Sequence, residues 1–115
     1  MDSPELSFET IEYPDRKDRA LYEGSTKAGV PWGNGILSMK NGDNYIGCFE
    51  NDLFNGLGKL IFSKNDTHDR KSYTGEFKNG NKQGKGKFEW KTGSVFEGEY
   101  LNDSRNGLGK HQLAS

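Results

Sequence analysis

The sequence predicts an all-β fold: a single-layer, twisted antiparallel meander of about eight short strands, arranged as four β-hairpins. Glycines recur in four sets of identical spacing, in which the second glycine follows the first by nine residues and the third follows by two more. An aromatic residue stands two positions before each set, at Tyr22, Tyr45, Tyr73 and Phe96. Spacing that repeats at a fixed period indicates an architecture in which each unit stacks on the next.

The first 21 residues do not follow this spacing, and we expect them to form an arm. Pro4 and Pro14 exclude a continuous helix or a central strand across this segment. Apolar and polar residues alternate at positions 6–8 and again at 11–13, as they do in a half-buried strand. The arm therefore contains one short extended segment, which either covers the first edge of the sheet or reaches a partner.

The repeat domain spans residues 22–115, with units at 22–44, 45–72, 73–95 and 96–115. Within a unit, the aromatic and glycine positions follow the two-residue period of a strand, first along one strand and then along the antiparallel strand that returns from the turn. Polar turns such as Asn79-Gly80 and Asn102-Asp103 join the two strands of a hairpin. The second unit has five extra residues, which predict a long polar loop at residues 63–72. This loop is either a solvated excursion or a recognition loop.

The two faces of the predicted sheet differ in composition. One carries the repeat aromatics together with further apolar residues: Leu37, Met39, Leu60, Phe62, Phe88, Trp90 and Leu113. The other carries Glu23, Glu76, Glu97 and Glu99 against Lys59, Lys87 and Lys110. Cross-strand pairs of opposite charge contribute from a few tenths to about 1 kcal/mol each. The strand glycines allow a neighbouring aromatic ring to lie over the backbone and allow the sheet to curve.

Composition and charge argue against several kinds of partner and compartment. The formal net charge of -1 disfavours nucleic acid, whose binders carry a strong basic excess. The single cysteine, Cys48, can form no internal disulfide, and its repeat position places it on the charged face. No apolar run approaches the ~18 residues of a membrane span, and no secretory signal is visible. We therefore expect an intracellular, cytoplasmic protein.

The motifs that carry catalysis or bind cofactors are not matched. The run Gly56-Leu57-Gly58-Lys59-Leu60 differs from a phosphate-binding loop, because Leu60 stands where serine or threonine is required. His68 and His111 fall in different contexts, whereas a metal site needs three or four converging ligands. We expect no enzyme activity, no cofactor and no metal.

The stretch Tyr73-Thr-Gly-Glu-Phe-Lys-Asn-Gly-Asn-Lys-Gln-Gly-Lys-Gly and its counterparts at Tyr45 and Phe96 resemble the signature of MORN repeats. The resemblance covers about residues 22–113. It implies a twisted antiparallel sheet of hairpins that forms an aromatic-lined groove. It also implies a non-catalytic scaffold, of the kind found in ciliary, cytoskeletal and membrane-junction assemblies, and some such repeats have been proposed to bind phospholipids.

The aromatic face is the best candidate for a partner-binding surface, because a one-layer sheet leaves part of a face without cover. The residues expected to be exposed for this contact are Phe62, Phe88 and Trp90, and Leu60 and Phe77 beside them complete the candidate partner-binding set. The expected function is a scaffold or adaptor that binds a helix or extended peptide of a protein partner, within a ciliary (axonemal) or cytoskeletal complex. Self-association through open sheet edges is compatible with this function.

The alternative is a membrane-surface module that binds anionic phospholipid. Its candidate residues are Lys59, Lys82, Lys85, Lys87 and Lys110. Attraction to an anionic membrane grows with uncompensated basic charge, so the interleaved glutamates disfavour this alternative.

Overall fold

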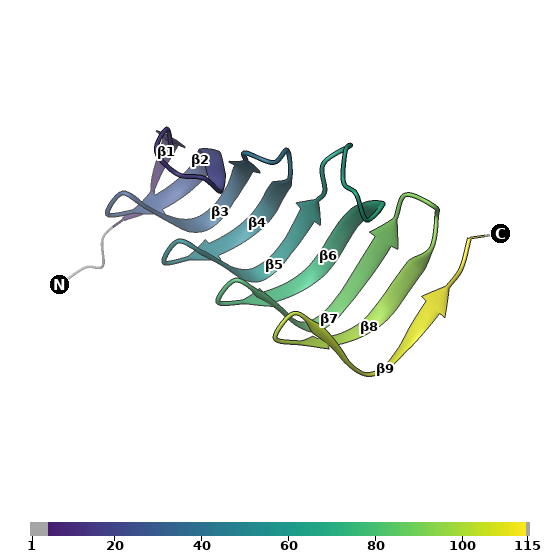
Figure 1. The fold of residues 1–115 in the computed structure, drawn as a ribbon. Helices are drawn as coiled ribbons and strands as arrows, with labels where there is room; N and C mark the ends of the chain where they lie inside the picture. The colour runs from purple at the N-terminus through teal and green to yellow at the C-terminus, as the bar shows by residue number, and fades with distance from the viewer. Residues whose placement is uncertain (1–4, 115) are drawn as a thin grey trace.

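A computed structural model describes residues 5–114 and contains one antiparallel sheet in a single layer (Figure 1). Its strands pair in chain order: β1 Ser7–Glu12, β2 Arg19–Lys27, β3 Val30–Met39, β4 Asn44–Glu50, β5 Leu53–Ile61, β6 Arg70–Lys78, β7 Asn81–Trp90, β8 Val95–Leu101 and β9 Ser104–Gln112. The predicted all-β meander of hairpins is confirmed. Within the described residues, no helix is long and apolar enough to cross a membrane. Residues 1–4 of the predicted arm, Pro4 included, and Ser115 of the fourth unit lie outside the described residues.

The arm supplies a ninth strand beyond the eight that the sequence predicted. β1 pairs antiparallel with β2, from Ser7 opposite Thr26 to Glu12 opposite Leu21. Of the two expectations for the arm, covering the first edge of the sheet is the one observed. Ile11 packs against the aromatic core from this strand, whereas Phe8 on its other face is 77% exposed.

Two-residue turns close the hairpins, as the sequence predicted. Both central residues have positive φ in each of the turns Ala28-Gly29, Asn51-Asp52, Asn79-Gly80 and Asn102-Asp103. This backbone matches the right-handed twist of the flanking strands and favours Asn, Asp and Gly. The turns therefore set the register in which the repeat residues face one another.

The strand glycines lie opposite one another in a continuous line from β2 to β9: Gly24, Gly35, Gly47, Gly58, Gly75, Gly86, Gly98 and Gly109. The aromatic ring of each repeat lies directly over this line. A Cβ atom on Gly86 would come within 2.2 Å of the Tyr73 hydroxyl oxygen, and one on Gly109 within 2.3 Å of Cζ of Phe96. The predicted packing of rings over glycines is confirmed.

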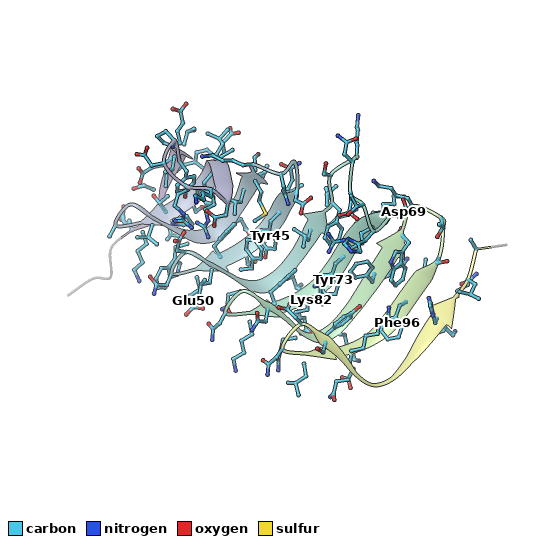
Figure 2. All side chains as sticks on the ribbon, viewed as in Figure 1. Tyr45, Glu50, Asp69, Tyr73, Lys82 and Phe96 are labelled. Carbon is cyan, nitrogen blue, oxygen red and sulfur yellow. The ribbon has the colours of Figure 1, made fainter. Side chains whose placement is uncertain are left out.

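The rings also pack on one another, edge to face, along the length of the sheet. Phe77 lies between Tyr45 and Tyr73, with ring centroids 5.3 and 5.2 Å away, and Tyr100 lies 5.1 Å beyond Tyr73. Figure 2 shows Tyr45, Tyr73 and Phe96 following one another across the sheet. Rings in this arrangement gain about 0.5–1.5 kcal/mol per pair beyond area burial. A single layer thus buries much of its aromatic face without a second layer.

Three of the buried tyrosine hydroxyls donate a hydrogen bond to the backbone of their own strand. Tyr22, Tyr45 and Tyr73 each donate to the carbonyl three residues on, at Ser25, Cys48 and Glu76, over 2.6, 2.9 and 3.2 Å. Because the rings are 0% exposed, burial raises the pKa of all three phenols.

The opposite face carries the expected alternation of charge. Glu97 lies between Lys87 and Lys110, and Lys85 is opposite Glu99. Among the described side chains, none of these cross-strand neighbours comes within ion-pair distance, and Lys87 instead lies 3.8 Å from Glu89. Leu113, expected on the last strand, lies just beyond the end of β9 with 72% of its surface exposed.

Candidate functional site

The apolar residues predicted to bind a partner differ in burial. Leu60 and Trp90 are half-buried, whereas Phe62, Phe77 and Phe88 are 8%, 5% and 9% exposed. The expected exposure is therefore wrong for Phe62 and Phe88. Their role in binding a partner stays a prediction, and Trp90 is the aromatic of this set that is most available.

Neighbouring side chains explain why the phenylalanines are buried. The guanidinium carbon of Arg70 lies 4.3 Å from the ring centroid of Phe62. Phe88 in turn packs between Phe62 and Trp90, at centroid distances of 5.6 and 4.6 Å. The long stem of an arginine can cover apolar surface while its charge stays in water.

The amino-terminal half of the aromatic face is closed by its own side chains. Phe54 stacks on Tyr45 with the ring planes 2° apart and the centroids 3.8 Å apart. Arg19 is 8% exposed, and its guanidinium donates to the Oδ1 atom and to the backbone carbonyl of Asp52. A partner finds little apolar surface here.

The carboxyl-terminal half of the same face forms a pocket of about 620 Å³. Its lining comes from the loop before β6 and from β6 to β9: His68, Arg70, Lys82, Phe88, Trp90, Tyr100, Asp103, Ser104 and Arg105. We refer to this site as the Trp90 pocket. It combines aromatic surface with cationic side chains, a combination suited to binding an amphipathic ligand.

One repeat position explains why the two halves of the face differ. The residue nine places after each repeat aromatic is Pro31, Phe54, Lys82 or Arg105. Phe54 covers Tyr45, whereas Nζ of Lys82 lies 5.5 Å from the Tyr73 ring centroid and Cζ of Arg105 lies 4.4 Å from that of Phe96. Lys82 lies close to Tyr73 in Figure 2. The covering residue is thus apolar in the first two units and cationic in the last two.

Arg105 and Arg70 line the site although neither is among the residues predicted from the sequence, and Lys82 lines it although its predicted role is lipid binding. Aligning the four units on their aromatics would have revealed the change from apolar to basic at the covering position. No comparable signal marks Arg70, whose contribution depends on the conformation of the inserted loop.

Two of the three cations in the Trp90 pocket have carboxylate partners. Lys82 lies 3.7 Å from Oδ1 of Asp103, and Arg70 lies 2.6 Å from Oδ1 of Asp66. Hydrogen bonds from Arg70 hold the pKa of the Asp66 carboxyl well below its usual range. Within the described part of the chain, Arg105 makes no ion pair, so its positive charge is uncompensated and available to a ligand.

The inserted loop of the second repeat forms one wall of this pocket and rises beside the sheet between β5 and β6 (Figure 1). It ends earlier than predicted, because β6 begins at Arg70. The Asp66 carboxylate accepts hydrogen bonds from the backbone N–H groups of His68 and Arg70, at 3.1 and 2.9 Å. Nζ of Lys91 donates to the carbonyls of Ser63 and Lys64. These contacts give the inserted loop a defined conformation, and its role as a recognition loop stays a prediction.

Replacing Asp66 with alanine is expected to loosen the inserted loop while the sheet stays folded. Backbone amides of His68 and Arg70 lose their acceptor, so their hydrogen exchange should accelerate by roughly tenfold, which corresponds to about 1.4 kcal/mol of local opening. Hydrogen exchange followed by mass spectrometry or NMR measures this. Asp69→Asn is the control, and equal acceleration in both variants would show that Asp66 does not organise the loop.

The residues of the phospholipid alternative do not share one surface. Lys59, Lys85, Lys87 and Lys110 are exposed on the face opposite the aromatic rings. Lys82 instead lines the Trp90 pocket. Two of the exposed lysines, Lys87 and Lys110, flank Glu97, whose negative charge offsets part of theirs.

The two histidines belong to different elements, as the sequence suggested. The ring of His111 packs 5.7 Å from Trp90, whereas His68 belongs to the inserted loop. Within residues 5–114, no group of three or more His, Cys, Asp and Glu side chains is placed to hold a metal ion.

Comparison with known proteins agrees with this architecture. The MORN repeat model matches residues 22–44, 45–67, 73–95 and 96–115. Human Alsin is 34% identical over 96 residues, and mouse Alsin is 33% identical over 90 residues. These alignments cover 84% and 78% of this chain but only 6% of either Alsin, so the chain spans a small part of the length of these relatives. MORN repeats are non-catalytic modules that generally mediate protein or membrane interactions. The chain belongs to the MORN repeat family.

Proposed function

We propose that this chain is a non-catalytic scaffold or adaptor that binds a helix or extended segment of a protein partner in the Trp90 pocket. One observation carries the proposal. The aromatic face is closed by Phe54 and by the Arg19–Asp52 pair over its amino-terminal half, but it forms a pocket of about 620 Å³ over its carboxyl-terminal half.

The composition of the pocket favours a protein partner. Trp90 and Tyr100 lie beside Arg105, and Trp, Tyr and Arg are the residues most enriched among those that dominate protein interfaces. Trp90 is half-buried and packs against Phe88, which holds its side chain in place. Binding a partner therefore costs little side-chain conformational entropy at Trp90.

The setting of the function follows from the family resemblance and stays a prediction. A ciliary or cytoskeletal assembly in the cytoplasm is the expected location. Self-association through the sheet edges is compatible with partner binding, because the edges and the aromatic face are different surfaces. Binding to a phospholipid surface is the competing outcome of the test below.

Replacing Trp90 with alanine is expected to weaken partner binding by about 30-fold, since a central interface tryptophan commonly contributes 2 kcal/mol or more. Peptides that bind the wild-type protein are first selected from a random phage-displayed library, and the peptide with the highest affinity is synthesised. Its affinity for wild type and variants is then measured by fluorescence anisotropy.

Trp32→Ala is the matched control. Trp32 packs under Nζ of Lys27, 4.5 Å from its ring centroid, and does not line the Trp90 pocket. We expect the peptide to bind this variant as tightly as wild type. Equal loss in both variants, or flotation with phosphoinositide-containing vesicles in the absence of any selected peptide, would overturn the proposal.

A further inference from the structure

We propose that the Trp90 pocket contains a carboxylate-binding subsite, in which Arg105 holds an aspartate or glutamate side chain of an extended, acidic partner segment. This inference rests on the proposed function and adds the chemistry of the partner. Three observations carry it: the charge left over in the pocket, the position of Arg105, and the hydroxyl of Tyr100.

The charge of the pocket fits one carboxylate. Arg70 and Lys82 are engaged by Asp66 and Asp103, at 2.6 and 3.7 Å. Among the described side chains, Arg105 forms no such pair. The pocket therefore offers the uncompensated charge of a single guanidinium, which is matched by a carboxylate and not by a multiply charged phosphate headgroup.

Arg105 is held over aromatic rings and not over a counter-ion. Its Cζ atom lies 4.4 Å from the ring centroid of Phe96 and 5.5 Å from that of Trp90. A guanidinium in contact with rings through its flat face keeps its edge N–H groups free to bind a carboxylate with two parallel hydrogen bonds. The residue itself is exposed, so a partner can reach it.

Tyr100 carries a hydroxyl that the fold does not need. The equivalent residues of the second and third units are Phe49 and Phe77, and their rings occupy the same place in the core. Tyr100 is 5% exposed, lines the Trp90 pocket and lies opposite Arg105 in the β8–β9 pairing. Within residues 5–114, no acceptor lies at hydrogen-bonding geometry to its hydroxyl proton.

A buried hydroxyl without an acceptor is costly, so its presence at a position where the second and third units have phenylalanine calls for an acceptor from outside the chain. Burial raises the pKa of Tyr100, whereas the charge of Arg105 and a hydrogen bond from its guanidinium to the hydroxyl oxygen oppose this shift, which agrees with the guanidinium lying next to the hydroxyl. A carboxylate held by Arg105 supplies the missing acceptor. Arg105 and Tyr100 thus act together on one group.

The peptide selected on the wild-type protein provides the test. The inference predicts that the peptide contains aspartate or glutamate. A synthetic version in which each carboxylate is changed to its amide should bind at least about tenfold more weakly. Arg105→Gln should cause a similar loss for the acidic peptide and almost none for the amide version. Affinity for the acidic peptide should also fall as salt is raised.

Two variants separate binding from folding. Lys110→Gln removes the same charge from the same strand, but on the opposite face, and should leave affinity within about twofold of wild type. Tyr100→Phe introduces the residue that the second and third units have at this position. Its unfolding midpoint should equal or exceed that of wild type, while affinity for the acidic peptide falls about fivefold.

The outcomes distinguish the two proposals. If the selected peptide depends on Trp90 but binds equally well as its amide version, the scaffold function stands and the carboxylate subsite is wrong. If Arg105→Gln and Lys110→Gln weaken binding alike, the effect is non-specific and the subsite is again wrong. If no peptide is selected at all, both proposals fail.

Discussion

Replacing Gly86 with alanine is expected to destabilise the protein by about 3 kcal/mol, at the upper end of the cost of overpacking a core. A Cβ atom there would lie 2.2 Å from the hydroxyl oxygen and 2.4 Å from a ring carbon of Tyr73. The ring has no room to move, because Tyr73 is 0% exposed and is flanked by Phe77 and Tyr100 with centroids 5.2 and 5.1 Å away. Such a loss is a large share of the stability of a small domain.

Chemical denaturation followed by circular dichroism measures this effect. Gly80→Asp is the matched control, because Asp52 and Asp103 occupy the same turn position with positive φ, and a Cβ atom at Gly80 would meet only Leu53, 3.9 Å away. The control should change the free energy of unfolding by about 1 kcal/mol at most. A Gly86→Ala variant as stable as this control would show that the ring does not lie fixed over the glycine.

Alkaline pH is expected to unfold the protein steeply, because three fully buried phenols resist ionisation. Burial raises the pKa of Tyr22 to about 12 and raises the pKa of Tyr45 and Tyr73 as well. In the unfolded chain these groups lose their protons near pH 10. Above that pH the unfolded state binds fewer protons than the folded state, so the free energy of unfolding falls. Its slope is up to about 1.4 kcal/mol per pH unit for each tyrosine.

Urea unfolding at a series of pH values from about 8 to 12 measures the slope. Tyr73→Phe is the internal control, because Phe96 fills the equivalent position of the fourth unit. This variant should be somewhat less stable at neutral pH, having lost its hydrogen bond to the Glu76 carbonyl, but its stability should fall less steeply above pH 10. Stability that stays constant up to pH 11 or so would contradict the burial of these hydroxyls.

The sequence predicts the hairpins and the ring-over-glycine packing because both follow from local spacing. A residue such as Gly86 is placed under Tyr73 by the two-residue period and by the Asn79-Gly80 turn, and nothing distant alters that register. The pairing of β1 with β2 was left open, since the arm lacks the repeat pattern that would fix a partner strand.

The burial of Phe62 and Phe88 could not be predicted in the same way. It depends on Arg70, which lies over Phe62 because Asp66 organises the inserted loop that precedes β6. Contacts made by an inserted segment have no counterpart in the other repeats, so comparing the units gives no information about them. Arg105, in contrast, occupies a repeat position, and its difference from Phe54 is visible in the sequence.

The location of the bound partner segment tests the central claim most directly. The chain has two tryptophans, Trp32 and Trp90, whose indole N–H signals can be followed separately by NMR during titration with the selected peptide. The Trp90 signal should shift together with the side-chain signal of Arg105, while the Trp32 signal and the amides around Lys87 and Lys110 stay in place. Shifts confined to Trp32 or to the lysine-bearing face would contradict binding in the Trp90 pocket.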